Sequence, residues 1–249
     1  MKVVVVGGTG LIGSKVVAHL SEQGHEAVVA APQTGVNTLT GEGVPQALAG
    51  AQVLVDVSNS PSFDEPPVHD FFTTSTTNLV AAAKAAGVRH YVALSVVGTQ
   101  RLTDSPYLRA KAAQENLIQQ SGIPYSIVHA TQFFEFVRGI TDAATVDNVV
   151  HLPHALIQPI AADDVATAVY RTAVGEPVNG TVEIAGPEQF GLDELAATGL
   201  RYRNEKREVI ADPDARYYGA RLQERSLIPD EDATIFDTRF EDWASHAAA

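Results

Sequence analysis

The chain has 249 residues, a formal net charge of −13 and no cysteine, which excludes disulfides, thiolate metal sites and cysteine nucleophiles. The acidic balance argues against nucleic-acid binding, which needs a basic face to displace the counterions of phosphate. No apolar run approaches the ~20 residues that cross a bilayer, and glycines interrupt the N-terminal apolar run where a signal peptide would continue. We therefore expect a cytoplasmic protein that does not interact with a membrane.

The first thirteen residues, MKVVVVGGTGLIG, predict a strand, a tight turn and the start of a helix. The β-branched run from Val3 to Val6 is typical of a strand that is buried on both faces. The glycines that follow fit both G-x-G-x-x-G and G-x-x-G-x-x-G. Such a turn lets the backbone approach a pyrophosphate, and the free N–H groups of the helix N-terminus favour that anion. We assign to the cofactor site Gly7, Gly8, Thr9, Gly10, Leu11, Ile12 and Gly13.

The next segments complete a β-α-β unit. An apolar stripe at helical spacing covers Leu11 to Gln23, and Glu26 to Ala31 has the composition of a strand. NAD-selective proteins place an acidic residue at the end of this strand, but this chain has neither an acid nor an arginine there, so the sequence leaves NAD and NADP both open. The polar residues Thr34 and Asn37 suit either phosphate binding or turn chemistry. The cofactor residues assigned here are Ala31, Gln33 and Thr34.

Strands and helices continue to alternate along the chain. A strand over Gln52 to Val57 is followed by a proline-rich loop in which Phe63 can cover a ligand, and Val57 and Ser58 are assigned to the cofactor site. The remaining pattern predicts helices over 68–86 and 104–121 and strands over 89–95 and 125–129. This alternation predicts an α/β fold, a doubly wound parallel Rossmann-type sheet with helices on both faces.

The later chain is less regular. A short strand is expected over 157–160, a helix over 163–174, a strand over 181–185 and a helix over 192–200. No linker or repeat divides the chain, so residues 1–249 are interpreted as one domain. Segments of about 131–160 and 186–249 are expected to leave the sheet and form a small C-terminal substrate cap.

Three residues form the predicted catalytic group. Tyr107 and Lys111 are four apart in a predicted helix and therefore project from one face. An ammonium beside a phenol favours the phenolate and lowers the pKa of the phenol, which suits a proton donor near neutral pH. Ser95 ends the preceding strand, where its hydroxyl can share a substrate oxygen with Tyr107. The alternative is a solvated helix face and a serine bonded to its own backbone.

Several stretches resemble one known family. The glycine turn, LSVVG at 94–98, YLRAK at 107–111, GIPYSIVHATQFFEF at 122–136 and QPIAADDVA at 158–166 are similar to the atypical short-chain dehydrogenase/reductase superfamily, in its NmrA-like branch. The resemblance covers about residues 1–187. It implies a bound nicotinamide dinucleotide, Tyr107 as proton donor or acceptor, Ser95 in support, and Lys111 bonded to the nicotinamide ribose.

The resemblance also places the remaining site residues. Ala130 and Thr131 are expected at the nicotinamide, and the substrate pocket is expected to be lined by Val97, His129, Gln132, Phe133 and Phe134. For His129 the alternative is a purely structural role. For Phe133 and Phe134 the alternative is packing in the hydrophobic core. Asp163 and Asp164 are adjacent carboxylates that open a helix, where capping and pairing with the helix dipole are the ordinary roles. No metal site is expected, because His151 and His154 lack companion ligands.

These observations predict an NAD(P)-dependent oxidoreductase that moves a hydride to or from a carbonyl or quinone-like substrate, as a monomer or homodimer. Two alternatives remain open. One is a tailoring enzyme, with an oxygenation outcome, for a polycyclic aromatic or polyketide-like substrate, which the aromatic residues near Phe133 support. The other is a non-catalytic NAD(P) redox sensor, which the resemblance permits, because many members of this branch lack the tyrosine and work as redox sensors or as reductases with a different proton economy. The presence of Tyr107 favours an enzyme.

Overall fold

A seven-stranded parallel sheet forms the centre of the molecule. The computed structural model describes residues 1–247. The strands lie in the order β12-β9-β5-β4-β3-β1-β2, and every neighbouring pair is parallel. Their bounds are β1 Lys2–Val6, β2 Glu26–Ala30, β3 Val53–Asp56, β4 His90–Val96, β5 Tyr125–Ala130, β9 Gly180–Ala185 and β12 Thr234–Ile235. The predicted doubly wound parallel sheet is confirmed.

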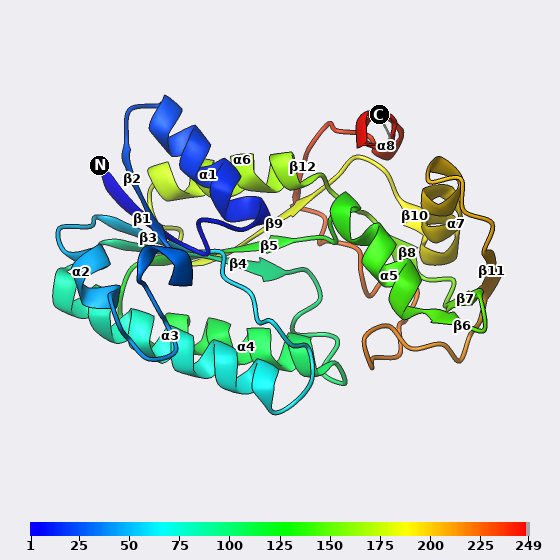
Figure 1. The fold of residues 1–249 in the computed structure, drawn as a ribbon, viewed down its shortest axis with the longest axis horizontal. Coiled ribbons are helices and arrows are strands. Elements are labelled where there is room, and N and C mark those ends of the chain that lie inside the picture. The colour runs from blue at the N-terminus through cyan, green and yellow to red at the C-terminus, as the bar shows by residue number, and fades with distance from the viewer. Residues whose placement is uncertain (248–249) are drawn as a thin grey trace.

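Helices cover both faces of this sheet (Figure 1). One face packs against α1 (Leu11–Glu22) and α6 (Ala162–Val174), and the other against α2 (Val44–Leu48), α3 (Pro67–Ala86) and α4 (Pro106–Gln119). Successive side chains of a strand point to opposite faces, so Val3 and Val5 join the first core cluster, while Val4 and Val6 join the second. The continuous apolar run at the N-terminus is therefore a strand that is buried on both sides.

Two elements begin or end at other residues than the sequence predicted, because capping and proline determine their bounds. The helix expected from residue 104 begins at Pro106, because Ser105 caps it by accepting a hydrogen bond from the Leu108 N–H at 3.5 Å. The strand expected over 157–160 is reduced to β8, Leu156–Ile157. Pro159 lacks the N–H that a longer ladder would need.

A second group of elements lies beside the carboxyl ends of the central strands, at the right of Figure 1. It contains two small sheets, β11-β7-β6 and β8-β10, and its own hydrophobic cluster, which includes Phe134, Leu195 and Phe240. The bounds are η2 Phe134–Phe136, α5 Val137–Ala143, β6 Thr145–Val146, β7 Val149–Leu152, β10 Phe190–Gly191, α7 Leu192–Tyr202, β11 Glu208–Ala211 and α8 Phe240–Ala247. We call these elements the cap, and their role over a substrate stays a prediction, as does the single-domain assignment.

Candidate functional site

The glycine turn lies where the strand order of the sheet reverses. After β1 the chain passes to β2 on one side and then to β3 on the other, so the turn after β1 and the loop after β3 are neighbours. A Cβ atom on Gly7, whose φ is +77°, would lie 2.9 Å from the Ser58 Cα atom. In open α/β sheets, ligands bind outside the carboxyl ends of the strands at such a reversal.

The turn leaves room for a pyrophosphate at the start of α1. A Cβ atom on Gly13 would lie 2.1 Å from the Gly7 carbonyl oxygen, so only glycine lets the helix begin this close to the turn. The first intrahelical bond runs from the Ser14 N–H to the Gly10 carbonyl at 3.0 Å, and no acidic side chain occupies the first helical turn. The N–H groups before Ser14 and the helix dipole are therefore suited to an anion. These residues fit a dinucleotide.

The residues after β2 use their side chains in turns. The Thr34 hydroxyl accepts a hydrogen bond from the Ala31 N–H at 3.0 Å, within the short 3₁₀ helix η1 (Pro32–Thr34). The Asn37 carboxamide accepts one from the Leu39 N–H at 2.9 Å. Both side chains thus follow the turn chemistry that the sequence left open. Ala31 is buried, and Gln33 is exposed.

The end of β5 carries an unpaired hydroxyl. Thr131 is 2% exposed, and its N–H donates to the Ile184 carbonyl at 3.1 Å. Its Oγ1 atom has no hydrogen-bond partner within residues 1–247. A buried hydroxyl without a partner is unfavourable, so this position suits a ligand group that bonds to it. The observation supports the assignment of Ala130 and Thr131 to the cofactor site, which stays a prediction.

Lys111 belongs to a buried polar network that reaches the glycine turn. Its Nζ atom donates to the Leu94 carbonyl at 2.9 Å and to the Gln114 side chain, and it lies 4.5 Å from the centre of the Phe72 ring. Gln114 donates to Asp56 at 3.0 Å, and Asp56 accepts from the Ser58 hydroxyl at 2.6 Å. Burial lowers the pKa of Lys111 to about 8, although Asp56 and Glu115 oppose that shift. Sequence analysis missed Asp56 and Gln114.

Tyr107 lies at the start of α4, in an aromatic cluster. Its ring packs edge-on against Phe63 of the loop after β3, with centres 5.1 Å apart, and against Phe72 of α3 at 5.9 Å. The expected lowering of the tyrosine pKa by Lys111 is wrong for this structure. Burial raises the pKa of the Tyr107 hydroxyl, and the nearby Tyr218 adds to the shift. The Lys111 ammonium is instead committed to β4 and Gln114.

Ser95 bonds to a carboxylate that sequence analysis did not identify. Glu115 of α4 is 2% exposed and accepts hydrogen bonds from the Ser95 hydroxyl and, at 2.9 Å, from His129 Nε2. His129 Nδ1 lies 3.5 Å from Glu183. Ser95, His129 and Glu183 are register partners on β4, β5 and β9, so their side chains share one face of the sheet. The four-residue spacing of Lys111 and Glu115 was an available clue, because it places both on one helix face.

This cluster fixes the charge of His129. Burial alone would lower the pKa of His129, but hydrogen bonds to Glu115 and Glu183 outweigh it and raise the pKa to about 9. Burial alone would raise the pKa of Glu115, but its hydrogen bonds to His129, Ser95 and Gln100 outweigh burial and lower the pKa. At neutral pH the structure therefore holds an ion pair between α4 and β5.

A pH dependence of stability follows from His129. Its pKa rises from 6.5 to about 9 on folding, so its stabilisation is complete below pH 6.5 and is lost as the pH rises through 9. We expect the free energy of unfolding of the wild type to fall in this interval, by at most about 1.4 kcal/mol per pH unit from this group. Urea unfolding at a series of pH values should show a flatter profile for His129→Gln. Exposed His69→Gln is the control, and a profile for His129→Gln that matches the wild type would contradict the ion pair.

The predicted pocket residues do not form one group. Phe134 is 1% exposed and packs in the cap core against Phe240 and Trp243, with ring centres 5.2 and 5.5 Å away. Phe133 stacks on the 42% exposed Phe136. Val97 is buried, and the Gln132 carbonyl accepts the Ile160 N–H at 2.9 Å. Phe134 thus has the core role that the sequence left open, and the pocket role of the others stays a prediction.

Asp163 and Asp164 do not cap α6. The N-cap residue is Ala161, and the Glu135 carboxylate receives the free Ala162 N–H at 3.2 Å. Asp163 forms an ion pair with Lys15 of α1 at 2.6 Å. Both aspartates do lie in the first helical turn, where they complement the helix dipole as expected.

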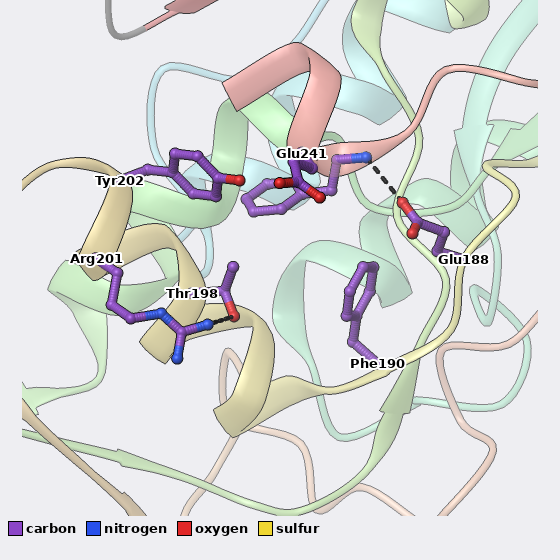
Figure 2. Close-up of a pocket in the computed structure, with 7 residues that line it drawn as sticks. Glu188, Phe190, Thr198, Arg201, Tyr202 and Glu241 are labelled. Atoms are coloured by element: carbon purple, nitrogen blue, oxygen red, sulfur yellow. Dashed lines mark hydrogen bonds between the residues drawn. The ribbon is translucent and has the colours of Figure 1, made fainter. Parts of the chain in front are cut away.

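Two pockets lie outside the glycine turn. One of about 370 Å³ contains His129, and loop 98–101, strand β9 and segment 230–234 surround it. The other, of about 380 Å³, lies in the cap between α7, β10 and α8 (Figure 2). It is lined by Glu188, Phe190, Thr198, Arg201, Tyr202, Phe240 and Glu241. None of the sequence-predicted site residues lines this second pocket.

Comparison with known proteins agrees with the turn geometry. A family model described as NAD(P)H-binding matches residues 7–174. The new type of NADPH-dependent quinone oxidoreductase, QOR2, from Escherichia coli has the same fold, with a TM-score of 0.71 and 18% identity over 99% of this chain and 100% of that one. These findings confirm the resemblance to atypical short-chain dehydrogenases/reductases in fold and in dinucleotide binding. NAD and NADP are not distinguished.

Two curated relatives differ in their described roles. The NAD(P)H azoreductase of Xenophilus azovorans is 29% identical over 78% of this chain and 71% of its own length. The Photosystem II assembly factor Ycf39 of Synechocystis sp. is 24% identical over 78% of this chain and 65% of its own length. The chain spans between 48% and 65% of the length of Ycf39 relatives from three organisms. Within residues 1–247, no helix is long and apolar enough to cross a membrane.

Proposed function

Because the chain belongs to the NAD(P)H-binding family, we propose that it is an NAD(P)-dependent reductase of carbonyl or quinone-like substrates, with Tyr107 as proton donor. The position of Tyr107 carries this proposal. It lies beyond the carboxyl end of β4, and its ring packs against Phe63 of the loop that follows β3. The relative named NAD(P)H azoreductase further supports reductase chemistry, on the basis of its name alone.

The glycine turn would hold the pyrophosphate, and Thr131 would bond to the cofactor near the end of β5. The reduced nicotinamide, when bound, supplies a hydride and with it the two electrons of the reduction. Tyr107 supplies the proton: its O–H bond breaks, the carbonyl oxygen becomes a hydroxyl, and solvent returns a proton to the phenolate. The Tyr107 hydroxyl carries its proton at neutral pH, but its raised pKa makes it a weaker acid than the lowered pKa expected from the sequence.

Lys111 and Ser95 have supporting roles in this proposal. Lys111 would turn from the Leu94 carbonyl to bond to the nicotinamide ribose. The Ser95 hydroxyl already donates its proton to Glu115, which its lowered pKa keeps ionised at neutral pH. A substrate carbonyl oxygen can only accept, so Ser95 would assist by turning its hydroxyl from Glu115 to donate to that oxygen.

Cofactor titration separates the reductase from a redox sensor. The protein is titrated with NADPH, NADH and their oxidised forms, and turnover is then followed with menadione and with cyclohexanone. A reductase oxidises bound reduced cofactor when a substrate is added. Discrimination between reduced and oxidised cofactor without turnover of either compound would contradict the proposal and favour a sensor.

A further inference from the structure

A tyrosine turn of the cap lies against the start of α4. The chain reverses over Tyr217–Ala220, where the Tyr217 N–H donates to the Ala220 carbonyl at 2.9 Å and the Ala220 N–H returns a bond of 3.0 Å. The central residues Tyr218 and Gly219 have φ values of +45° and +87°. A Cβ atom on Gly219 would lie 3.6 Å from the Pro106 Cδ atom. The turn is therefore held next to the residue that precedes Tyr107.

Aromatic rings from three separate segments meet at this place. Tyr218 of the turn lies 6.1 Å from Phe63, whose ring lies 5.1 Å from Tyr107. Tyr217 packs edge-on against Tyr218 at 4.9 Å. Phe63 and Tyr218 are 48% and 41% exposed, so they form the solvent side of the cluster. We call Phe63, Tyr107, Tyr217 and Tyr218 the aromatic cluster.

The Tyr217 hydroxyl has no hydrogen-bond partner among the residues that the structure describes. Tyr217 is 4% exposed, and no hydrogen-bond acceptor or donor for its hydroxyl exists within residues 1–247. Tyr217 belongs to the buried cluster of the cap against which Tyr107 packs, and burial raises the pKa of its hydroxyl. Native proteins pair the great majority of buried hydroxyls, because an unpaired one has lost water without compensation. An acceptor from outside the chain would satisfy this donor.

We propose that Tyr217 is a second hydrogen-bond donor to the substrate oxygen that Tyr107 protonates, and that the substrate is a flat aromatic carbonyl compound of the quinone class. A carbonyl oxygen has two lone pairs and can accept from both phenols at once. The rings of Phe63 and Tyr218 offer apolar faces on which a flat molecule can stack. This inference rests on the proposed function and adds a substrate class and a residue of the cap to it.

Tyr217→Phe tests the hydroxyl alone, because the ring is kept. With reduced cofactor and menadione as the probe, we expect kcat to fall about 100-fold, as when one donor to a developing oxyanion is removed. Affinity for NADPH and NADH should not change, and the unfolding temperature should stay the same or rise, because an unpaired buried hydroxyl is gone. Tyr170→Phe is the matched control, since Tyr170 of α6 contacts His19 on the opposite face of the sheet.

Comparison of Tyr217→Phe with Tyr107→Phe distinguishes a failure of the inference from a failure of the proposed function. Menadione turnover by Tyr217→Phe within threefold of the wild type would show an ordinary buried tyrosine and overturn the inference. If Tyr107→Phe loses turnover in the same assay, the proposed function stands while the inference falls. If Tyr107→Phe also keeps its turnover, Tyr107 is not the proton donor, and the inference falls together with that part of the proposed function.

Phe63→Leu tests the substrate class at a side chain that is 48% exposed, and it keeps an apolar side chain there. We expect the KM for menadione to rise about tenfold, because one stacking face for an aromatic substrate is removed. The KM for cyclohexanone, where turnover is measurable, should change less than that for menadione. An unchanged KM for menadione would overturn the assignment to flat aromatic compounds.

Discussion

Replacement of Tyr107 by phenylalanine is expected to lower kcat for menadione at least about 100-fold, because a positioned proton donor contributes this much or more. The ring contacts with Phe63 and Phe72 do not involve the hydroxyl, so the variant should fold with an unchanged unfolding temperature. Steady-state kinetics at saturating NADPH or NADH measure the effect.

One further measurement and one control variant accompany this prediction. Affinity for reduced cofactor should be the same in Tyr107→Phe and the wild type, since the glycine turn is untouched. Tyr170→Phe again serves as the control for loss of a phenol elsewhere. Turnover within threefold of the wild type would mean that another group supplies the proton.

Replacement of Gly13 by alanine is expected to remove dinucleotide binding. The new Cβ atom would lie 2.1 Å from the Gly7 carbonyl oxygen, far inside contact distance, so α1 must move away from the turn. The N–H groups that face the pyrophosphate move with it, and we expect the Kd for NADPH and NADH to rise at least about 100-fold. Titration followed by cofactor fluorescence measures this change.

Gly139→Ala provides the matched control for the glycine prediction. Gly139 lies in α5, and a Cβ atom there meets nothing within 4 Å. Alanine is also the better helix former, so this variant should bind cofactor as the wild type does and unfold no earlier. Equal affinities for Gly13→Ala and the wild type would contradict the assignment of the turn.

Local sequence patterns predicted most of the central sheet and its helices. The apolar run at Val3–Val6 and the helical stripe after it are properties of neighbouring residues, and they predicted β1 and α1 within a residue or two. The tail beyond residue 201 has weaker patterns, and β11, β12 and α8 were not predicted. β12 has two residues and is a strand only because it pairs with β9. Such an element is decided by its partner, which a local pattern does not contain.

The candidate site was also predicted only where local spacing determines it. The helical spacing placed Tyr107 and Lys111 on α4, but it did not give the direction of the ammonium, which depends on the Leu94 carbonyl of β4. Glu115 was missed because its partners, Ser95 and His129, come from two other elements. Tyr217 was missed for the same reason, since only the folded chain brings the tail to α4.

Single-turnover oxidation of bound cofactor tests the central claim most directly. The protein is loaded with one equivalent of NADPH or NADH, menadione is added in excess, and the near-ultraviolet absorbance of the reduced nicotinamide is followed. A reductase that uses Tyr107 should consume all of the bound reduced cofactor in one fast phase, and this phase should be slowed at least about 100-fold in Tyr107→Phe. Reduced cofactor that stays bound and unoxidised in the wild type, or an equally fast phase in the variant, would contradict the account.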